Sequence, residues 1–473
     1  MAEDSFNPSS CDVTLAIITS YDGSTSYDIS SNFIGSWSIT QSMGDFAWQG
    51  EAFIMDASNL LEGFPLRGEE YFELWLETYD VKTTVKLKAR IHKITDIVPA
   101  PNSNSVTYKI HFVSETSWDA SLRKITKPYQ NGISSIARNI FENYFAPLGP
   151  VSYLDPIDRA KVLPMATARY PIESGEEPQR SFVIQPTGGL AKIIIPDLSP
   201  ADAMFFIAAR AFNAESPSQT FRFFETFDGY YFCTDEYFLK GVRPESVKNL
   251  FYAPNVPLTG QNLDAQVERI EELQVLSKGI DSYLDMTSGS YRNEVVEIDL
   301  IRREFNISKF NFDNVRYVSM DGKLRDLADN PHTSGFRQDT FTAENAKRFI
   351  LYKNYQKPGD TPGNLQANKH IAEIVHNRVS YYHHLNNTVL LIGLKGRLDL
   401  RPGNIVNVDM KELNNANPNS SAINNRTLSG RYLLQSVQHT MDEQGILNTA
   451  ARIVKFDWNL GSDYSSEDQL PEE

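Results

Sequence analysis

The alternation of apolar and polar residues predicts β-strands at both ends of the chain. Residues 85–94 (VKLKARIHKI) and 432–439 (YLLQSVQH) follow a period of two, with polar side chains on both faces. Successive side chains of a strand point to opposite sides, so this period is typical of β structure. Similar short runs recur through residues 12–114, where helical spacing is nearly absent. We therefore predict an all-β unit over 12–114, folded as an antiparallel barrel.

Two further stretches, 263–318 and 387–458, also show the β pattern. Within 294–305 the sequence has the character of a single strand with charged outer positions. Residues 447–457 alternate after a DEQG turn at 442–445. Both stretches are predicted to be antiparallel strands joined by turns.

The segment between these β regions, residues 115–261, has a mixed pattern. Residues 132–144 place isoleucines and a phenylalanine at helical spacing, and Ser199 followed by Pro200 is typical of a helix start. Residues 221–234 predict a hairpin, because a central Asp-Gly pair separates two apolar runs. We predict an α/β insertion domain over 115–261.

A smaller insertion is predicted over residues 319–386. Helix candidates lie at 342–355 and 367–385, separated by a segment rich in proline and glycine. The C-terminal residues 459–473 are rich in Ser, Asp and Glu, which predicts a flexible acidic tail. The fold class is therefore predicted to be α+β and mainly β, with two antiparallel β-barrels and α/β insertion domains.

Composition excludes several classes of protein. The chain has 473 residues, of which 41% are hydrophobic, enough for roughly three or four domains with sizeable cores. No apolar run approaches the roughly 18 residues needed to cross a bilayer, so we expect no membrane insertion. A formal charge of −15 argues against wrapping nucleic acid, because phosphate binding needs cationic surface. Cys11 and Cys233 have neither disulfide-framework nor zinc-site spacing.

Candidate catalytic and metal motifs are isolated. The adjacent histidines 383–384 have no other ligand at zinc spacing, and Ser121 with Lys124 matches a four-residue pattern that recurs by chance. Asp155 and Asp158 illustrate carboxylates that lack a second element for acid–base chemistry. We therefore predict no catalytic, metal or cofactor site.

Several short motifs at both ends resemble a known family. They are LRPGNIV at 400–406, SGRYLLQSVQH at 429–439, SYD at 20–22, IGSWSITQSM at 34–43 and EAFIMD at 51–56. In order and type they resemble the baseplate central hub proteins of contractile-tailed bacteriophages, the T-even type. Late-control proteins and type VI spike proteins are related to that family. The resemblance covers both ends of the chain well and the middle poorly.

The resemblance implies a specific architecture. Residues 12–114 would form one tail-tube-like barrel, and 263–318 plus 387–458 would form a second barrel that an insertion splits. A homotrimer would then present six barrels, so that a three-fold spike could meet a six-fold tube. Closed rings require like interfaces repeated around an axis, which is the physical basis of this matching.

The implied function is that of a structural hub with no enzymatic activity and no cofactor. Its expected partners are the central spike protein, tail tube or tube-initiator proteins and neighbouring baseplate wedge proteins. DNA would pass through without specific binding, across an inner surface that is net negative or neutral. The expected location is the tail baseplate of the virion, assembled in the host cytoplasm.

Two alternatives remain open at this stage. One is a particle-associated peptidoglycan hydrolase, because lytic domains are carried by the same particles, although nothing here resembles their glutamate-centred motif. The other is a tail-tube or type VI subunit, although a tube protein needs only one barrel and a full spike needs a C-terminal β-helix.

The hub hypothesis also predicts where subunits meet. Strands that contact neighbours in a ring must leave their bonding edges open, and the strands at 85–94 and 432–439 are the candidates. The candidate inter-subunit contacts are Lys86, Lys88, Arg90, Lys93, Ser436 and Gln438. By strict alternation Lys86, Lys88 and Arg90 share one face of their strand, and Lys93 lies on the other face. An ordinary solvated face is the competing interpretation of the same residues.

Overall fold

The computed structural model describes most of the chain between residues 9 and 455. The segments outside the description are 1–8, 31–35, 65, 79–83, 100–104, 146–150, 155–179, 214–215, 217, 241–246, 253–265, 279–281, 291, 301–302, 312–315, 319–323, 327–346, 353–370, 411–424, 426–427 and 456–473. The predicted acidic tail at 459–473 and the carboxylates of Asp155 and Asp158 therefore lie outside the described residues.

The N-terminal part of the chain is built of strands with one short helix. They are β1 (Cys11–Thr19), β2 (Ser26–Asp28), β3 (Trp37–Ser42), β4 (Gln49–Asp56), α1 (Leu60–Gly63), β5 (Tyr71–Thr78), β6 (Thr84–Pro99) and β7 (Val106–Ser114). The strand predicted at 85–94 is confirmed as part of β6.

A second group of strands comes from the C-terminal half. They are β14 (Lys248–Tyr252), β15 (Glu272–Lys278), β21 (Thr388–Lys395), β22 (Ile405–Met410), β23 (Gly430–Met441) and β24 (Leu447–Lys455). The strand predicted at 432–439 is confirmed as part of β23.

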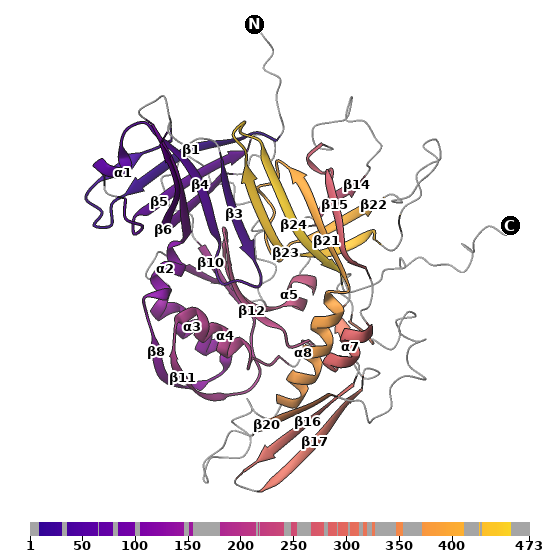
Figure 1. Cartoon of the computed structure of the whole chain (residues 1–473). Helices are drawn as coiled ribbons and strands as arrows, with labels where there is room; N and C mark the ends of the chain where they lie inside the picture. Colours follow the sequence, from indigo (N-terminus) through magenta and orange to yellow (C-terminus); the bar gives the residue numbers. More distant parts are fainter. Residues whose placement is uncertain are drawn as a thin grey trace, which may run out of the picture.

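Both groups join in one thirteen-stranded sheet (Figure 1). Its main path follows the order β15-β21-β24-β23-β3-β4-β7-β6-β5-β1-β2, and β22 and β14 branch from β23. The contact between β23 and β3 connects the two ends of the sequence. The predicted class, α+β and mainly β, is confirmed.

The N-terminal strands curl around one core and form what we call the first lobe. Along β5 half-buried and buried side chains alternate without a break, as expected for a strand with one face on a core. The core is aromatic at its centre and includes the fully buried side chains of Trp37, Trp48, Phe72, Tyr108 and Phe112.

The C-terminal strands enclose a separate aliphatic core and form the second lobe. β22 bridges β23 to β14, and β14 then contacts the segment that leads into β15. Phe251 N donates to Glu268 O at 3.0 Å, and Ile270 N donates to Phe251 O at 2.8 Å. Glu271 N continues the ring by donating to Gly393 O of β21 at 2.9 Å. The second lobe is thereby closed around its core.

The tip of the β23–β24 hairpin completes the first lobe. β3 pairs with the C-terminal half of β23, and the turn beyond it meets the start of β1. Cys11 N donates to Gly445 O at 3.0 Å, and Leu447 N donates to Ser9 O at 2.8 Å. Met441 and Leu447 are buried in the first-lobe core. Residues from the far end of the sequence therefore fill a gap in the N-terminal barrel.

An α/β unit lies beneath the first lobe (Figure 1). A four-stranded sheet has the order β12-β13-β10-β9, formed by β12 (Phe221–Thr226), β13 (Gly229–Thr234), β10 (Arg180–Ile184) and β9 (Val151–Leu154). Around it lie the ribbon of β8 (Ile125–Asn131) and β11 (Ala191–Leu198) and the helices α2 (Glu115–Ser121), α3 (Ile133–Tyr144), α4 (Pro200–Ala208) and α5 (Asp235–Lys240). The predicted helix at 132–144 and the predicted hairpin at 221–234 are confirmed. Ser199 caps α4 as predicted, because its side chain accepts from Asp202 N at 3.1 Å.

A third unit lies below the second lobe (Figure 1). It has the sheet β17-β16-β20, from β16 (Arg292–Asp299), β17 (Glu304–Asn311) and β20 (Lys347–Tyr352). The separate pair of β18 (Arg316–Val318) and β19 (Leu324–Asp326) contacts α5 through β18. Helices α7 (Ser282–Ser288) and α8 (Ile371–Leu385) lie between this sheet and the second lobe (Figure 1). His376 of α8 hydrogen-bonds Asn293 of β16 and, at 3.0 Å, Ser308 of β17.

The strand assignments within the second barrel were partly wrong. β16 and β17 were expected in that barrel, but they pair with each other and with β20 in a separate sheet. β14 was placed in the α/β insertion, but it pairs with β22 of the second lobe. Alternation predicts that a segment is a strand and says nothing about its partner, which is why these errors arose.

Two local predictions also fail in this region. Residues 294–305 were expected to be one strand, whereas they contain the turn between β16 and β17, with Arg303 at a φ of 55°. Residues 342–355 were predicted to be helical, but 347–352 form β20, which is parallel to β16. Its sequence KRFILY is short and apolar, and such a run fits a strand or a helix equally well until a partner is known.

Replacing Gly50 of β4 by alanine is expected to lower the stability of the first lobe by about 1–3 kcal/mol. A Cβ at this position would lie 2.6 Å from ring atoms of Phe112 and 2.8 Å from Ser38 O. Gly63→Ala is the matched control, because nothing lies within 4 Å of its Cβ position. Thermal unfolding measures both variants, and equal midpoints would contradict the close packing at Gly50.

Candidate functional surface

The place where the two lobes join presents a distinctive outer face. β3, β23 and β24 expose short polar side chains there, in register from strand to strand. Thr40 pairs with Gln438, and Gln438 pairs with Ala450. We call this set the junction face; its members are Ser38, Thr40, Ser42, Ser436, Gln438, Thr440, Asn448 and Ala450.

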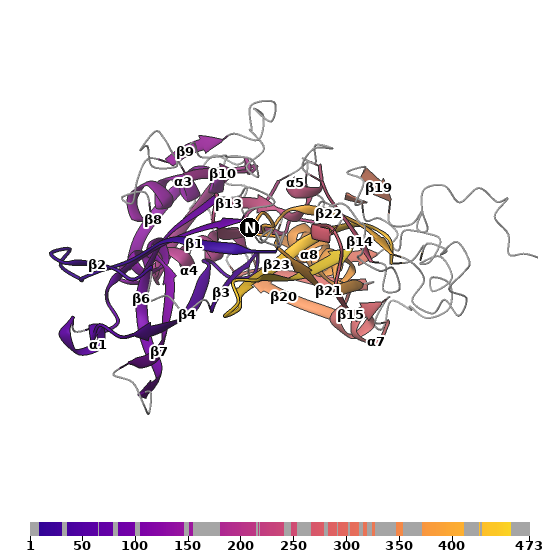
Figure 2. The same cartoon turned by 90° about the horizontal axis from the view of Figure 1, so that it is seen from above.

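The intervening residues show why this set points outward. Ile39 and Gln41 of β3 and Val437, His439 and Ala451 of the hairpin are each at most 1% exposed. Since side chains alternate across a sheet, the junction face must lie on the opposite side from both cores. Figure 2 shows the two lobes side by side, with β3 and β23 between them.

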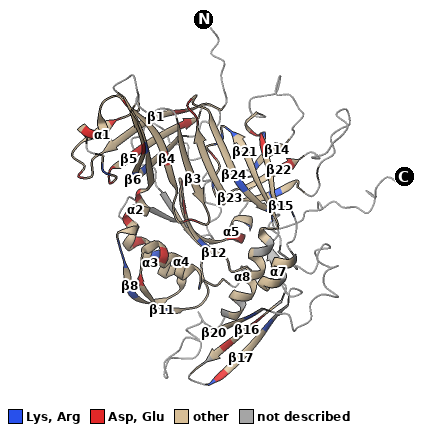
Figure 3. Cartoon of the chain, in the orientation of Figure 1, with Lys and Arg blue, Asp and Glu red and all other residues tan. Residues whose placement is uncertain are grey.

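No member of the junction face carries a charge, and Figure 3 shows β3 without any charged residue. Its polar groups also bond to one another across the lobes. Gln438 Nε2 donates to Ser38 Oγ at 2.8 Å, and Thr440 Oγ1 donates to the same atom at 3.3 Å. Because these side chains bond to one another, fewer of their polar groups are free to bind a polyanion. None of the members is a cation that would attract one.

Charged residues lie directly beside this face, and one of them is the exposed Arg452 of β24, which pairs with Ser436. Glu51 of β4 pairs with Ser38, and on the other side Lys395 of β21 pairs with Asn448. Glu51 is neutralised in part by Lys109, whose Nζ lies 3.5 Å from Glu51 Oε2. The centre of the outer sheet surface is therefore a neutral strip between mixed charges.

The predicted contact residues on β6 lie on the outer face, and Lys86 and Arg90 contact aromatic rings of the same chain. Lys86 Nζ lies 3.9 Å from the centroid of the Trp75 ring. Arg90 is 8% exposed, its guanidinium carbon lies 3.3 Å from the centroid of the Tyr71 ring, and Nη1 donates to Glu69 O at 2.8 Å. Charge reversal at Arg90 would thus disturb folding before it tested any contact between subunits.

The predicted side of Lys93 was wrong. Strict alternation placed it on the face opposite Lys88, but β6 has a bulge between Ile91 and Lys93. The extra residue shifts the pattern by one, so that Lys93 pairs with His111 on the outer face. Lys88 and Lys93 are both exposed and therefore share one side of the sheet.

The expectation that these two strands are open edges was wrong for β23, whereas β6 keeps one unpaired edge over most of its length. Among the residues described, β5 pairs with β6 from Thr84 to Arg90 and β7 pairs with it from Ala89 onward, so only Ala89 and Arg90 have strand partners on both sides. β23 has β24 on one side and β22 and β3 on the other. Ser436 and Gln438 therefore form a seam within one chain, and a contact of theirs with another subunit stays a prediction.

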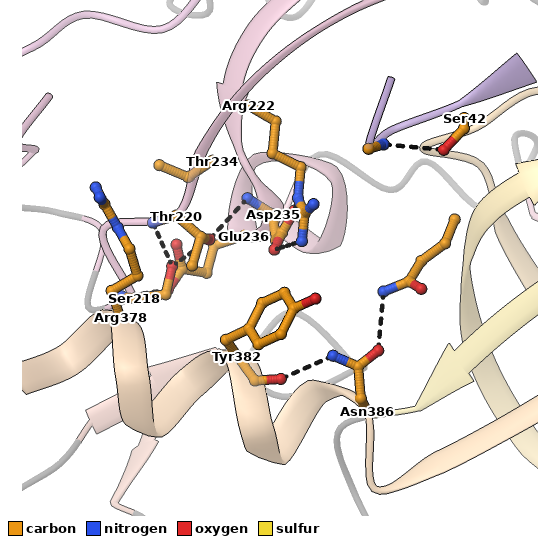
Figure 4. Close-up of polar contacts among 12 residues, drawn as sticks. Ser42, Ser218, Thr220, Arg222, Thr234, Asp235, Glu236, Arg378, Tyr382 and Asn386 are labelled. Carbon is orange, nitrogen blue, oxygen red and sulfur yellow. Dashed lines mark hydrogen bonds and ion pairs between the residues drawn. The ribbon is translucent and has the colours of Figure 1, made fainter. Parts of the chain in front are cut away.

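A buried carboxylate near α5 is the described feature most similar to a general acid. Burial raises the pKa of Glu236, although Ser216 and Ser218 donate hydrogen bonds to its carboxylate. Glycoside hydrolases need two carboxyl groups that flank a bound substrate, whereas Glu236 is 1% exposed. Nearby, Arg378 of α8 donates to Gln219 O at 2.7 Å. Figure 4 shows Arg378 on the helix that passes beside Ser218 and Glu236. These contacts anchor α8 to the α/β unit and lend no support to the hydrolase alternative.

A buried group of charges joins β14 to the segment between β21 and β22 within the second lobe. Arg397 forms two bonds to Asp399, at 2.8 and 3.1 Å, and Lys248 Nζ lies 2.8 Å from the same carboxylate. Burial alone would raise the pKa of Asp399, but the two cations outweigh it and hold that pKa below its usual range. Beside this group, Arg401 Nε donates to Asp228 at the tip of the β12–β13 hairpin at 3.1 Å.

His439 lies at the centre of the joint between the lobes. Its side chain is fully buried, its Nδ1 lies 3.2 Å from Thr449 Oγ1, and its ring is 6.0 Å from that of Phe227. Burial, together with the nearby Arg401, lowers the pKa of His439 to about 3. The imidazole is therefore neutral in the folded protein at physiological pH.

Stability is expected to fall as the pH drops below 6.5, and His439 should account for part of the loss. The folded pKa is lower than the unfolded value of 6.5, so the unfolded chain takes up the proton first. The destabilisation caused by His439 is absent above pH 6.5 and grows by about 1.4 kcal/mol per pH unit below it. Urea unfolding of wild type and His439→Asn from pH 8 to 4 measures the difference in slope. Equal slopes of the unfolding free energy against pH in the two proteins would contradict the assigned role of His439.

Comparisons with known proteins give structural neighbours. No protein-family model and no curated protein matches the sequence. The chain is similar to a tail protein from Neisseria meningitidis MC58, with a TM-score of 0.48 and 11% identity over 94% of this chain and 96% of that one. The 43 kDa tail protein of prophage MuSo2 from Shewanella oneidensis has a TM-score of 0.48 and 10% identity, covering 94% and 99%.

A further neighbour is the E. coli c3393 protein, a component of the type VI secretion system. Its TM-score is 0.39 at 9% identity, over 90% of this chain and 74% of that one. These are tail proteins and a type VI component, the kinds of protein that the sequence resemblance named. All three TM-scores lie below 0.5.

Among the residues that the structure describes, no group of three or more His, Cys, Asp or Glu side chains could hold a metal ion. Within the same residues, no helix combines the length and apolar character that a membrane crossing needs.

Proposed function

We propose that the chain is the structural hub of a contractile phage tail baseplate. Three copies form a ring that joins the six-fold tail tube to the three-fold central spike, and DNA passes through its centre. Tube or tube-initiator proteins and baseplate wedge proteins are the other partners. The hub works in the virion tail and is assembled in the host cytoplasm.

One observation carries this proposal furthest. Two β-lobes from opposite ends of the sequence share one sheet, and the junction face between them has no charged member, although Arg452 and Glu51 lie beside it. A chain with two lobes in one continuous wall supports the matching of a trimer to a six-fold tube. A neutral wall supports passage of DNA, because a cationic one would hold it through many phosphate contacts.

The subunit count tests the proposal directly. Mass photometry at micromolar concentration should show a trimer, either for the protein alone or after addition of the spike protein of the same particle. A monomer under both conditions would contradict the hub. A muralytic assay on the purified chain should show no lysis of host cell walls, and lysis would favour the hydrolase alternative.

A further inference from the structure

The outer face of the sheet becomes apolar at its two ends. In the first lobe, Val98 of β6 pairs with Thr107, which pairs with Met55 of β4; Val98 and Met55 are 57% and 44% exposed. In the second lobe, Leu276 of β15 and Leu391 of β21 are 50% and 37% exposed. The uncharged junction face lies between these apolar patches.

Both patches lie beside a backbone edge with a partner on one side only, among the residues described. β5 pairs with β6 only as far as Arg90, so residues 92–99 of β6 pair with β7 alone. β15 pairs with β21 alone. Such edges are templates for pairing with another chain.

The strand directions allow these two edges to meet between copies. Eight strands lie along the path from β15 to β6, and each neighbouring pair is antiparallel. An even number of alternating strands leaves the two end strands antiparallel to each other. Rotation about an axis along the strands keeps their directions, so an end strand of one copy meets the other end strand of the next copy in antiparallel order. The alternating pattern then continues around a closed ring.

We propose that, in the trimeric hub on which this inference rests, residues 92–99 of one copy pack as the antiparallel neighbour of β15 in the next copy. With Val98 beside Leu276, the antiparallel order directs Asp96, in the bulge between Thr95 and Val98, towards the end of β15 that carries Lys278. Asp96 and Lys278 are both exposed and have opposite charges, and within its own chain Asp96 Oδ2 lies 3.8 Å from Lys109 Nζ. The apolar patch at Val98 of one copy therefore covers the apolar patch at Leu276 of the next copy, and the contact removes both patches from water.

A double variant, Val98→Cys with Leu276→Cys, tests this contact in the full-length protein. The native Cys11 and Cys233 are buried, so a short bis-maleimide should react mainly with the added thiols. We expect covalent dimers and closed trimers on a denaturing gel, and mostly monomers from either single variant. The matched control is Leu122→Cys with Leu276→Cys, because Leu122 is 71% exposed and lies beyond α2, away from the sheet edge.

The outcomes separate this contact from the hub itself. Trimers by mass photometry that fail to cross-link through positions 98 and 276, or that cross-link equally well in the control, would overturn the contact and leave the hub standing. Cross-linking of either cysteine to the spike protein in place of a second copy would also overturn it. A chain that stays monomeric with and without the spike would overturn the hub, and the contact with it.

Discussion

Replacing Thr40 and Gln438 by lysine is expected to turn a ring that ignores duplex DNA into one that binds it. These two side chains pair across β3 and β23 in the middle of the junction face. A ring of three copies would gain roughly six positive charges, and that many phosphate contacts lower affinity about a thousandfold or more between about 50 and 200 mM salt. We expect no measurable binding by wild type at physiological salt and submicromolar binding by the variant, measured by fluorescence anisotropy.

The control adds the same charges elsewhere on the subunit. Thr126→Lys with Gln130→Lys places them at exposed positions of β8, which belongs to the α/β unit and not to the thirteen-stranded sheet. Binding inside a ring should also require a free DNA end. A preassembled ring of the first variant is therefore expected to prefer a linear duplex over a closed circle, and the control should show no such preference. Submicromolar binding by wild type with a steep salt slope would contradict the proposed conduit.

Removing the carboxylate of Asp399 is expected to destabilise the protein by about 3–5 kcal/mol. Arg397 and Lys248 both bond this carboxylate, and Asp399 is 4% exposed. Asp399→Ala would leave two cations close together at a site largely closed to water, which costs more than the ion pair itself contributes. Equilibrium unfolding in urea at pH 7 measures the loss.

A surface carboxylate provides the comparison. Glu443 is exposed in the β23–β24 turn, and Glu443→Ala is expected to change stability by less than about 0.5 kcal/mol. A loss below about 1 kcal/mol for Asp399→Ala would show that Arg397 and Lys248 find water or other partners once the carboxylate is gone. The buried charges would then contribute little to the stability of the second lobe.

The sequence alone determined the elements whose signals are local. The β12–β13 hairpin follows from a turn pair between two apolar runs, and the start of α4 follows from Ser199 followed by Pro200. β6 and β23 follow from a period of two. Each of these signals lies within a few residues of the structure that it specifies, so no knowledge of the rest of the chain was needed.

Tertiary structure decided which strands pair and what each outer face does. The bulge that turns Lys93 outward is set by the pairing of β6 with β7, and β20 is a strand because β16 is available beside it. The junction face joins Gln438 to Ser38, 400 positions apart in the chain. Alternation reports which residues share a side of one strand, but every strand offers two edges to any partner. Each of these segments is uncharged by itself, but only packing brings β3 and β23 together in one face, because they pair across the fold.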